Sequence, residues 1–285
     1  MLFLWIIASI GFSAHDTQIE KMVFKSNSTQ LTGFLYKPVG PKKFPVVLIA
    51  HAAGLPLHDA PIYIDLEKNL NKIGVAVFSY DRRGNGLSGG DPKSSDFNLL
   101  AGDLNAAIVA LKRREDIDST MIGLYGISQG AWIAPIAYSQ NKSAIQFMIL
   151  VSACGVSPAE QMKYSMKTAL KKDGYPDSII QKGVKTRNLL DDYYRGKLQK
   201  WEVQAEIDYA KNKPWFGDLY LPNGGQLPES PCDTKWFHDM DFRPADYFKQ
   251  INIHVLLIYG QRDRWVPINK SITVWQEQHA DMQNR

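Results

Sequence analysis

Residues 124–135 read LYGISQGAWIAP, the most informative stretch of the chain. An apolar strand-like run leads into Gly126-Ile127-Ser128-Gln129-Gly130, and a helix-like run follows. A serine in this setting is typical of a nucleophile elbow, because small residues on both sides permit the strained turn that exposes the hydroxyl. The bare G-x-S-x-G pattern arises by chance about once in ten chains of this length, so the strand-to-helix junction carries the inference. We predict that Ser128 is a nucleophile; a tight structural turn is the alternative.

Short apolar runs alternate with helical ones along the rest of the chain. Five runs predict buried strands: FPVVLIAH (44–51), GVAVFSYD (74–81), MIGLYGIS (121–128), IQFMILVSA (145–153) and IHVLLIYG (253–260). Helical periodicity occupies residues 97–114 and 130–140, and the alternating stretches at 17–26 and 31–38 predict an antiparallel hairpin. Together they predict an α/β fold, with a mostly parallel sheet and helices on both faces.

Residues 157–250 break this rhythm with helices rich in Lys, Asp and Tyr, followed by an irregular stretch of Pro, Gly and Trp. We predict that they form a helical cap over one edge of the sheet, dividing the core into residues 15–156 and 251–285. The cap segment holds four aromatic residues of interest: Trp215, Phe216, Trp236 and Phe237. They either form an apolar acyl pocket or pack between the cap helices.

Composition narrows the class of protein. The 285 residues are 45% hydrophobic and 22% charged, with a net charge of +4 from scattered basic residues, so no stripe for nucleic acid or membrane is present. The uncharged apolar run from Leu2 to Phe12 is shorter than the ~20 residues that span a bilayer. We therefore expect a signal peptide over residues 1–14, a mature chain without a membrane span, and a secreted or periplasmic location. A mis-chosen start codon or a buried first strand is the alternative.

Cys154 and Cys232 are the two cysteines of the chain. Two are too few for a disulfide framework, yet they could pair in an exported protein. Unpaired structural cysteines are the other interpretation.

Four segments together resemble the α/β-hydrolase family, most of all bacterial capped esterases, thioesterases and dipeptidyl-peptidase-like members. They are FPVVLIAHAAG (44–54), FSYDRRGNGLSGG (78–90), IGLYGISQGAWIAP (122–135) and FRPADYFKQINIHVLLIYGQRDRWVP (242–267). The resemblance implies that backbone N–H groups of Ala53 and Gln129 form an oxyanion hole. Ala52 stands where the family has glycine, which predicts a narrower or differently shaped hole. His51 would support this loop.

The resemblance also implies the acid of a catalytic triad. Asp263 lies in a G-x-x-D-x-x-V-P setting after an apolar run, where a carboxylate would hold an imidazole in its reactive tautomer. A solvated loop aspartate beside Arg262 and Arg264 is the alternative.

Residues 84–89 form a G-x-G-x-x-G pattern that could suggest a dinucleotide site. That site requires a helix to open within the glycines, so that its N-terminus faces the pyrophosphate. Here the helix-breaking run GGDPKSS (89–95) follows, and helical periodicity resumes only near Phe97. We predict a loop beside the active site and no cofactor. No metal site is expected either, because His, Cys and carboxylates are not clustered at metal-ligand spacing.

The sequence offers no suitable histidine as the general base of the triad. A serine hydroxyl needs a histidine to take its proton, and the family order places that histidine after the acid. Four residues recur on one face of a C-terminal helix: Ile268, Ile272, Trp275 and His279. From Pro267 to His279 this helix spans about 18 Å and runs toward the opposite edge of the sheet from Ser128. His279 is therefore an unsuitable base.

The remaining family pattern would need on the order of 25 to 30 further residues. We expect the histidine beyond Arg285, in a chain truncated before its last strand and helix or in a natural variant that lost them. His58 and His238 are substitutes only if the fold brings them over Ser128. Without that unit, the strand at 253–260 would have an exposed apolar edge, which predicts poor solubility or dimerisation.

These features predict a serine hydrolase that cleaves carboxylic esters through an acyl-serine intermediate, with a small-molecule acyl substrate and impaired activity in this form. A peptidase or thioesterase of the same fold is one alternative. A non-catalytic binding protein that keeps the pocket is another.

Overall fold

The computed structural model describes residues 17–40 and 43–280, so the expected signal peptide at 1–14 lies outside the described part. Seven strands of this part form one sheet in the order β1-β2-β4-β3-β5-β6-β7. Their bounds are β1 Thr17–Ser26, β2 Thr29–Pro38, β3 Phe44–Ala50, β4 Ala76–Tyr80, β5 Ile117–Ile127, β6 Phe147–Val151 and β7 His254–Ile258. β2 pairs antiparallel with β1 and β4, and the other pairs are parallel. The predicted mostly parallel sheet is confirmed.

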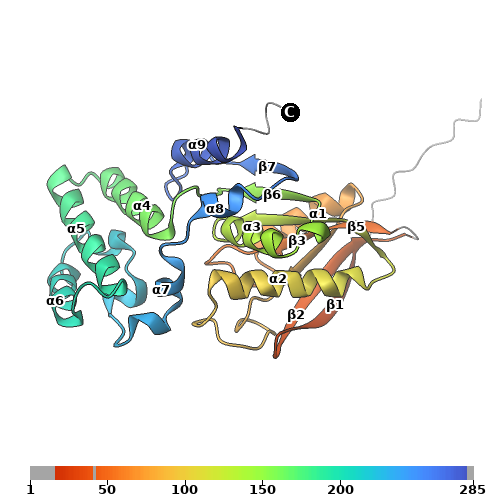
Figure 1. The fold of residues 1–285 in the computed structure, drawn as a ribbon, viewed down its shortest axis with the longest axis horizontal. Helices are drawn as coiled ribbons and strands as arrows, with labels where there is room; N and C mark the ends of the chain where they lie inside the picture. The colour runs from red at the N-terminus through yellow and green to blue at the C-terminus, as the bar shows by residue number, and fades with distance from the viewer. Residues whose placement is uncertain (1–16, 41–42, 281–285) are drawn as a thin grey trace, which may run out of the picture.

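Helices cover both faces of the sheet, as predicted (Figure 1). In the described part they are α1 Pro61–Lys72, α2 Phe97–Lys112, α3 Gly130–Gln140, α4 Pro158–Lys172, α5 Asp177–Tyr194, α6 Lys200–Lys211, α7 Lys235–Asp239, α8 Pro244–Phe248 and α9 Ile268–His279. α2 and α3 lie on one face, where Leu48 and Phe78 belong to the largest apolar core. α1 lies on the other face, over Val47 and Val77. Strand alternation therefore sends successive side chains into two separate cores.

The helix α1 was not predicted from the sequence. The buried positions of this helix are Tyr63, Glu67 and Asn71, which are spaced four residues apart. Tyr63, Leu66 and Leu70 pack into the core at helical spacing, so an apolar face is present, but the polar Glu67 and Asn71 are buried beside them and weaken the pattern. Asn71 is accommodated because its side-chain amide donates to the carbonyl oxygens of Tyr36 and Val75, each at 3.2 Å.

α4 to α8 lie between β6 and β7 in the chain, and α4 to α6 stand to one side of the sheet (Figure 1). They enclose apolar clusters of their own, built around Leu190, Val203 and Ile207 in one case and Met166 and Trp215 in the other. Trp215 thus packs inside the cap segment.

β7 pairs with β6 alone among the described strands. Leu256 and Ile258 are 56% and 43% exposed. In the register they stand beside Ile149 and Val151, which pack on the α1 side of the sheet. This end of the sheet therefore presents apolar side chains to solvent.

Candidate active site

Ser128 follows β5 directly and has a left-handed backbone conformation, with φ of 54°. The residues two positions to either side of it, Gly126 and Gly130, must be glycine because other backbone segments approach them closely. A Cβ atom on Gly126 would lie 2.6 Å from the carbonyl oxygen of Gly130, and one on Gly130 would lie 1.9 Å from the carbonyl oxygen of Ala50. The backbone N–H of Ser128 donates to Val151 at 2.9 Å. A positive φ outside glycine costs free energy and is typical of functional sites, and this turn presents the serine at the carboxyl edge of the sheet.

Ala53 follows β3 at the same edge, and Gln129 directly precedes α3. Both residues line one cavity with Ser128. Within the described part of the chain, neither backbone N–H donates a hydrogen bond to the protein. The arrangement therefore leaves two donors available to an oxygen atom near Ser128.

Neighbouring contacts fix the loop that holds Ala53. The backbone N–H of Ala52 donates to the Tyr63 hydroxyl at 3.0 Å, and that hydroxyl donates to the carbonyl oxygen of Leu55 at 3.1 Å. Ala52 is not among the residues of positive φ, so alanine causes no strain at the position where the family has glycine. The ring of His51 is buried between the edges of Tyr63 and Tyr80, and burial lowers its pKa well below the usual value. His51 is thus a neutral packing group.

Asp263 lies in the loop after β7, where two backbone N–H groups and one side-chain hydroxyl donate to its carboxylate. Its Oδ1 accepts from the backbone N–H groups of Trp265 at 2.8 Å and Val266 at 3.1 Å. Its Oδ2 accepts from the hydroxyl of Ser152 at 2.8 Å. Ser152, which directly follows β6 and has φ of 52°, lines the Ser128 cavity. Asp263 is therefore linked to the cavity wall through Ser152.

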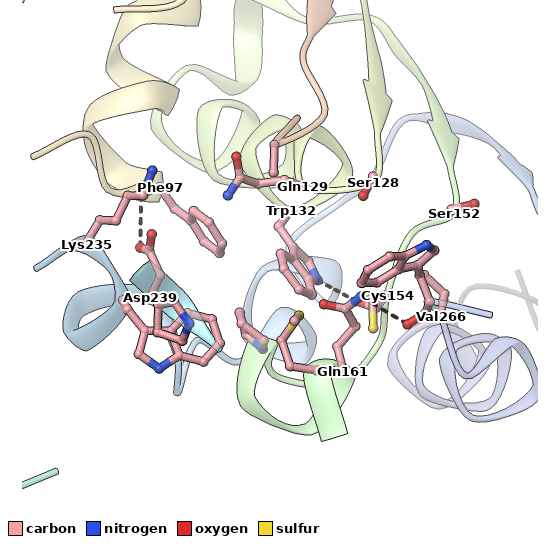
Figure 2. A pocket seen from close by; sticks show the side chains of 16 residues that line it. Phe97, Ser128, Gln129, Trp132, Ser152, Cys154, Gln161, Lys235, Asp239 and Val266 are labelled. Carbon is pink, nitrogen blue, oxygen red and sulfur yellow. Dashed lines mark hydrogen bonds between the residues drawn. The ribbon is translucent and has the colours of Figure 1, made fainter. Parts of the chain in front are cut away.

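The cavity has a volume of about 300 Å³ and lies between the sheet edge and the cap segment (Figure 2). Its apolar wall consists mainly of Phe97, Trp132, Cys154, Pro158, Met162, Trp236, Trp265 and Val266. Of the four aromatic residues noted in the sequence, Trp236 lines the cavity, whereas Phe237 is 40% exposed. The wall suits an apolar group of a small ligand.

Cys154 and Cys232 are both free. Cys154 is buried in the cavity wall, where burial raises the pKa of its thiol to about 12. Its backbone carbonyl accepts from the indole N–H of Trp132 at 2.7 Å. A thiol that stays protonated is a poor nucleophile, so Cys154 is a poor candidate for the nucleophile of the cavity.

One end of the cavity is polar, and sequence reasoning missed it. Asp239 and Lys235 of α7 line this end (Figure 2). Burial raises the pKa of Asp239 to about 7, while its Oδ1 accepts from the backbone N–H of Phe97 at 3.0 Å. Burial, and then the nearby charge of Arg82, lower the pKa of Lys235. These residues are distant in sequence from Ser128, and no local pattern marks them.

The described part of the chain holds five histidines: His51, His58, His238, His254 and His279. None of these five lines the cavity. His58 contacts Asp81 through Nδ1 at 2.7 Å and stacks on Phe34, and His238 packs against Phe237. The Nδ1 atom of His279 lies 2.9 Å from the carbonyl oxygen of Trp275, one turn back in the same helix. No described histidine is therefore in place to take the Ser128 proton.

The glycine-rich segment 84–89 is a closed loop after β4. The carboxylate of Asp81 occupies its centre, accepting from the backbone N–H groups of His58 and Leu87, and a Cβ atom on Gly86 would lie 2.3 Å from that carboxylate. The next helix, α2, begins at Phe97. The loop therefore lacks the helix N-terminus that a dinucleotide pyrophosphate needs.

The described residues contain no group of three or more His, Cys, Asp or Glu side chains placed to hold a metal ion. None of the helices in that part is both long and apolar enough to cross a membrane.

A family model described as "Serine aminopeptidase, S33" matches residues 42–195, which is more than half of the chain. The chain belongs to this family of α/β-hydrolases. Because the match spans β3 to α5, it includes the Ser128 turn and the Ala53 loop.

This α/β-hydrolase is also similar to curated proteins. It is 24% identical over 261 residues to Esterase EstD of Thermotoga maritima, an alignment that covers 89% of this chain and 55% of the relative. It is 31% identical over 118 residues to a monoglyceride lipase homolog of monkeypox virus, covering 41% of each chain. The chain therefore spans about half the length, or less, of these relatives.

Solved structures show the same fold. An esterase of Pyrococcus furiosus superposes with a TM-score of 0.59 at 18% identity, covering 93% of this chain and 78% of the other. The protein Est1E of Butyrivibrio proteoclasticus, solved with ferulic acid bound, has a TM-score of 0.57 at 17% identity and covers 90% and 85%. At this identity the likeness supports the α/β-hydrolase fold alone.

Proposed function

We propose that this α/β-hydrolase cleaves carboxylic esters through an acyl intermediate on Ser128. The observation that carries the proposal is the cavity in which Ser128 meets the unengaged backbone N–H groups of Ala53 and Gln129. The Ser128 oxygen attacks the ester carbonyl, the two N–H groups bind the oxyanion, and the alcohol leaves. Water then hydrolyses the acyl-serine and releases the acid.

Asp263 orients the imidazole that takes the proton of Ser128. Its carboxylate is already fixed by Ser152, Trp265 and Val266. The base itself is not among the described residues, so we expect Ser128 to react slowly in this chain, at the rate that an oxyanion hole and a binding pocket allow.

The substrate is a small ester with an apolar group. Met162, Trp132 and Trp236 offer aliphatic and aromatic contacts to that group. The relatives named as an esterase and as a monoglyceride lipase homolog favour an ester. The family description favours a peptide bond as the alternative, and a thioester meets the same nucleophile and oxyanion hole.

A second candidate is a binding protein that keeps the cavity without turnover. It is favoured by the five described histidines, all of which lie away from the cavity. The two functions differ in one property, which is the reactivity of Ser128 toward electrophiles.

Labelling with a fluorophosphonate tests this property. The esterase proposal expects one adduct on Ser128, identified by peptide mass spectrometry, and none in Ser128→Ala. A Ser139→Ala variant is the matched control, because Ser139 lies near the end of α3, outside the cavity lining. If the folded wild-type chain, verified by circular dichroism, shows no adduct on Ser128, the esterase proposal is wrong and the binding protein is the better reading.

A further inference from the structure

A second, smaller cavity adjoins the oxyanion donors. Its volume is about 110 Å³, and Ala53 and Gln129 line it as well as the Ser128 cavity. Arg82 and Lys235 also line it, and Lys235 again belongs to both cavities. Arg83 lines the small cavity too but is paired with Asp103. Two cationic side chains without an ion-pair partner among the described residues therefore stand beside the position where a substrate carbonyl would bind.

Arg82 is buried and lacks a counter-ion. It is 8% exposed, and no described carboxylate lies within ion-pair distance of it, although the charges of Asp103 and Asp239 act on it from farther away. Its guanidinium has five N–H donors, of which one donates to the carbonyl oxygen of Ala52 at 3.2 Å. The neighbouring Arg83 shows the contrast, because both carboxylate oxygens of Asp103 accept from it. Burial lowers the pKa of Arg82, as expected of a cation removed from water.

Lys235 is the second unpaired cation. In the described part of the chain it makes no ion pair, and its ammonium group donates only to the carbonyl oxygen of Pro92, at 3.5 Å. On α7 the charge of Asp239 acts on Lys235, but Oδ1 of Asp239 accepts from the Phe97 N–H, and burial raises the pKa of Asp239 to about 7. Asp91 and Asp96 act on Lys235 and Asp239 from the loop before α2, without forming ion pairs. The positive charge of the small cavity is thus only partly offset.

Removing a charge from water without a partner costs free energy. The buried Arg82 bears this cost, and the exposed Lys235 adds a second positive charge to the same cavity, so the pair favours an anionic ligand. We propose that the small cavity binds a carboxylate group of the substrate, and that the enzyme selects esters with a free carboxylate a few atoms from the scissile carbonyl. The cavity is of the right size, because about 110 Å³ holds a carboxylate but exceeds the ~30 Å³ of one water. The planar fork of Arg82 matches carboxylate geometry.

This selectivity rests on the proposed ester hydrolysis. Ala53 and Gln129 line both cavities, so one small molecule can place its carbonyl on their N–H groups and its carboxylate against Arg82 and Lys235. The apolar remainder of such a molecule would occupy the larger cavity.

The test compares two esters that differ by one charge, monomethyl glutarate and dimethyl glutarate. Binding is measured by calorimetry in a Ser128→Ala background, so that it needs no turnover. Charge-assisted hydrogen bonds lead us to expect at least about tenfold tighter binding of the monoester. Lys235→Met should weaken binding of the monoester far more than binding of the diester and so remove most of this preference, whereas the charge-keeping Lys235→Arg should retain it.

Lys235 is chosen over Arg82 because Arg82 also holds the loop of Ala53 through the Ala52 carbonyl. Equal affinity for the two esters would overturn the proposal, as would an equal loss of both in Lys235→Met or no binding of the monoester at millimolar concentration. These outcomes are separate from fluorophosphonate labelling of Ser128, which probes the nucleophile without needing an anionic ligand.

Discussion

The Ser128 turn depends on a glycine with almost no space around it, and Gly130→Ala tests this dependence. The new Cβ atom would lie 1.9 Å from the carbonyl oxygen of Ala50, 2.5 Å from its carbonyl carbon and 3.0 Å from the carbonyl oxygen of His51. All three are backbone atoms at the end of β3. They cannot move aside as the end of a flexible side chain would.

The cost of this substitution follows from the displacement that it requires. Relief needs a shift of more than about 1 Å between α3 and the end of β3, since non-bonded carbon atoms pack at about 3.5 Å. Overpacking in a well-packed interior costs about 1–3 kcal/mol, occasionally more. Ala50 also pairs with Gly126 at the centre of the sheet. We therefore expect a loss of about 3 kcal/mol or more in the free energy of unfolding.

Urea unfolding followed by circular dichroism measures this loss. With a slope of about 3 kcal/mol per molar urea, the midpoint of Gly130→Ala should fall by about 1 M. Gly102→Ala is the matched control, because Gly102 lies inside α2 and a Cβ atom there would meet nothing within 4 Å. Replacing a helical glycine stabilises by about 1 kcal/mol, so this midpoint should rise. A Gly130→Ala protein with the wild-type midpoint would refute the close approach on which the nucleophile turn rests.

Three other predictions concern the cavity and the sheet edge. Burial raises the pKa of Asp239 to about 7, so the folded protein favours the protonated carboxyl. The stability that this residue contributes is fully present below the pKa of Asp in the unfolded chain and is lost as pH rises through about 7. The urea midpoint of the wild type should therefore fall as pH rises to about 7, and the midpoint of Asp239→Asn should fall less. Identical pH profiles for the two proteins would contradict this assignment. Iodoacetamide should alkylate the exposed Cys232 and spare the buried Cys154 in the folded chain, as checked by peptide mass spectrometry; equal modification of both would count against the buried thiol. The exposed Leu256 and Ile258 should cause self-association in size-exclusion chromatography, reduced by Leu256→Lys; a well-behaved wild-type monomer would be evidence against it.

The sheet was predictable because its strands are apolar runs bounded by turn residues. Parallel strands bring their carboxyl ends to one edge, so Ala53 and Ser128 could be placed near each other before the fold was seen. β5 was the least accurate strand. It begins at Ile117, four residues before the apolar run, because its first residues pair across a register shift with β3. The polar stretch at 118–120 hides that extension.

The polar parts of the cavity were not predictable in the same way. Asp239 and Lys235 come from α7, more than a hundred residues after Ser128, and cap helices carry no alternation that points a side chain at the sheet edge. Ser152 is an exception, because its place at the cavity could have been predicted from the sequence. It directly follows β6, and a residue in that position lies at the same edge as Ser128 and Asp263.

The hydrogen bonds of Asp263 determine where a base can act. An ionised carboxylate offers about four acceptor sites, two on each oxygen. Oδ1 accepts from two backbone N–H groups, those of Trp265 and Val266, and Oδ2 accepts from Ser152. One acceptor site therefore remains, on Oδ2, next to a residue that lines the Ser128 cavity. An imidazole that donated to this site would share Oδ2 with the Ser152 hydroxyl, and Asp263 is held in place for it by contacts that need no histidine.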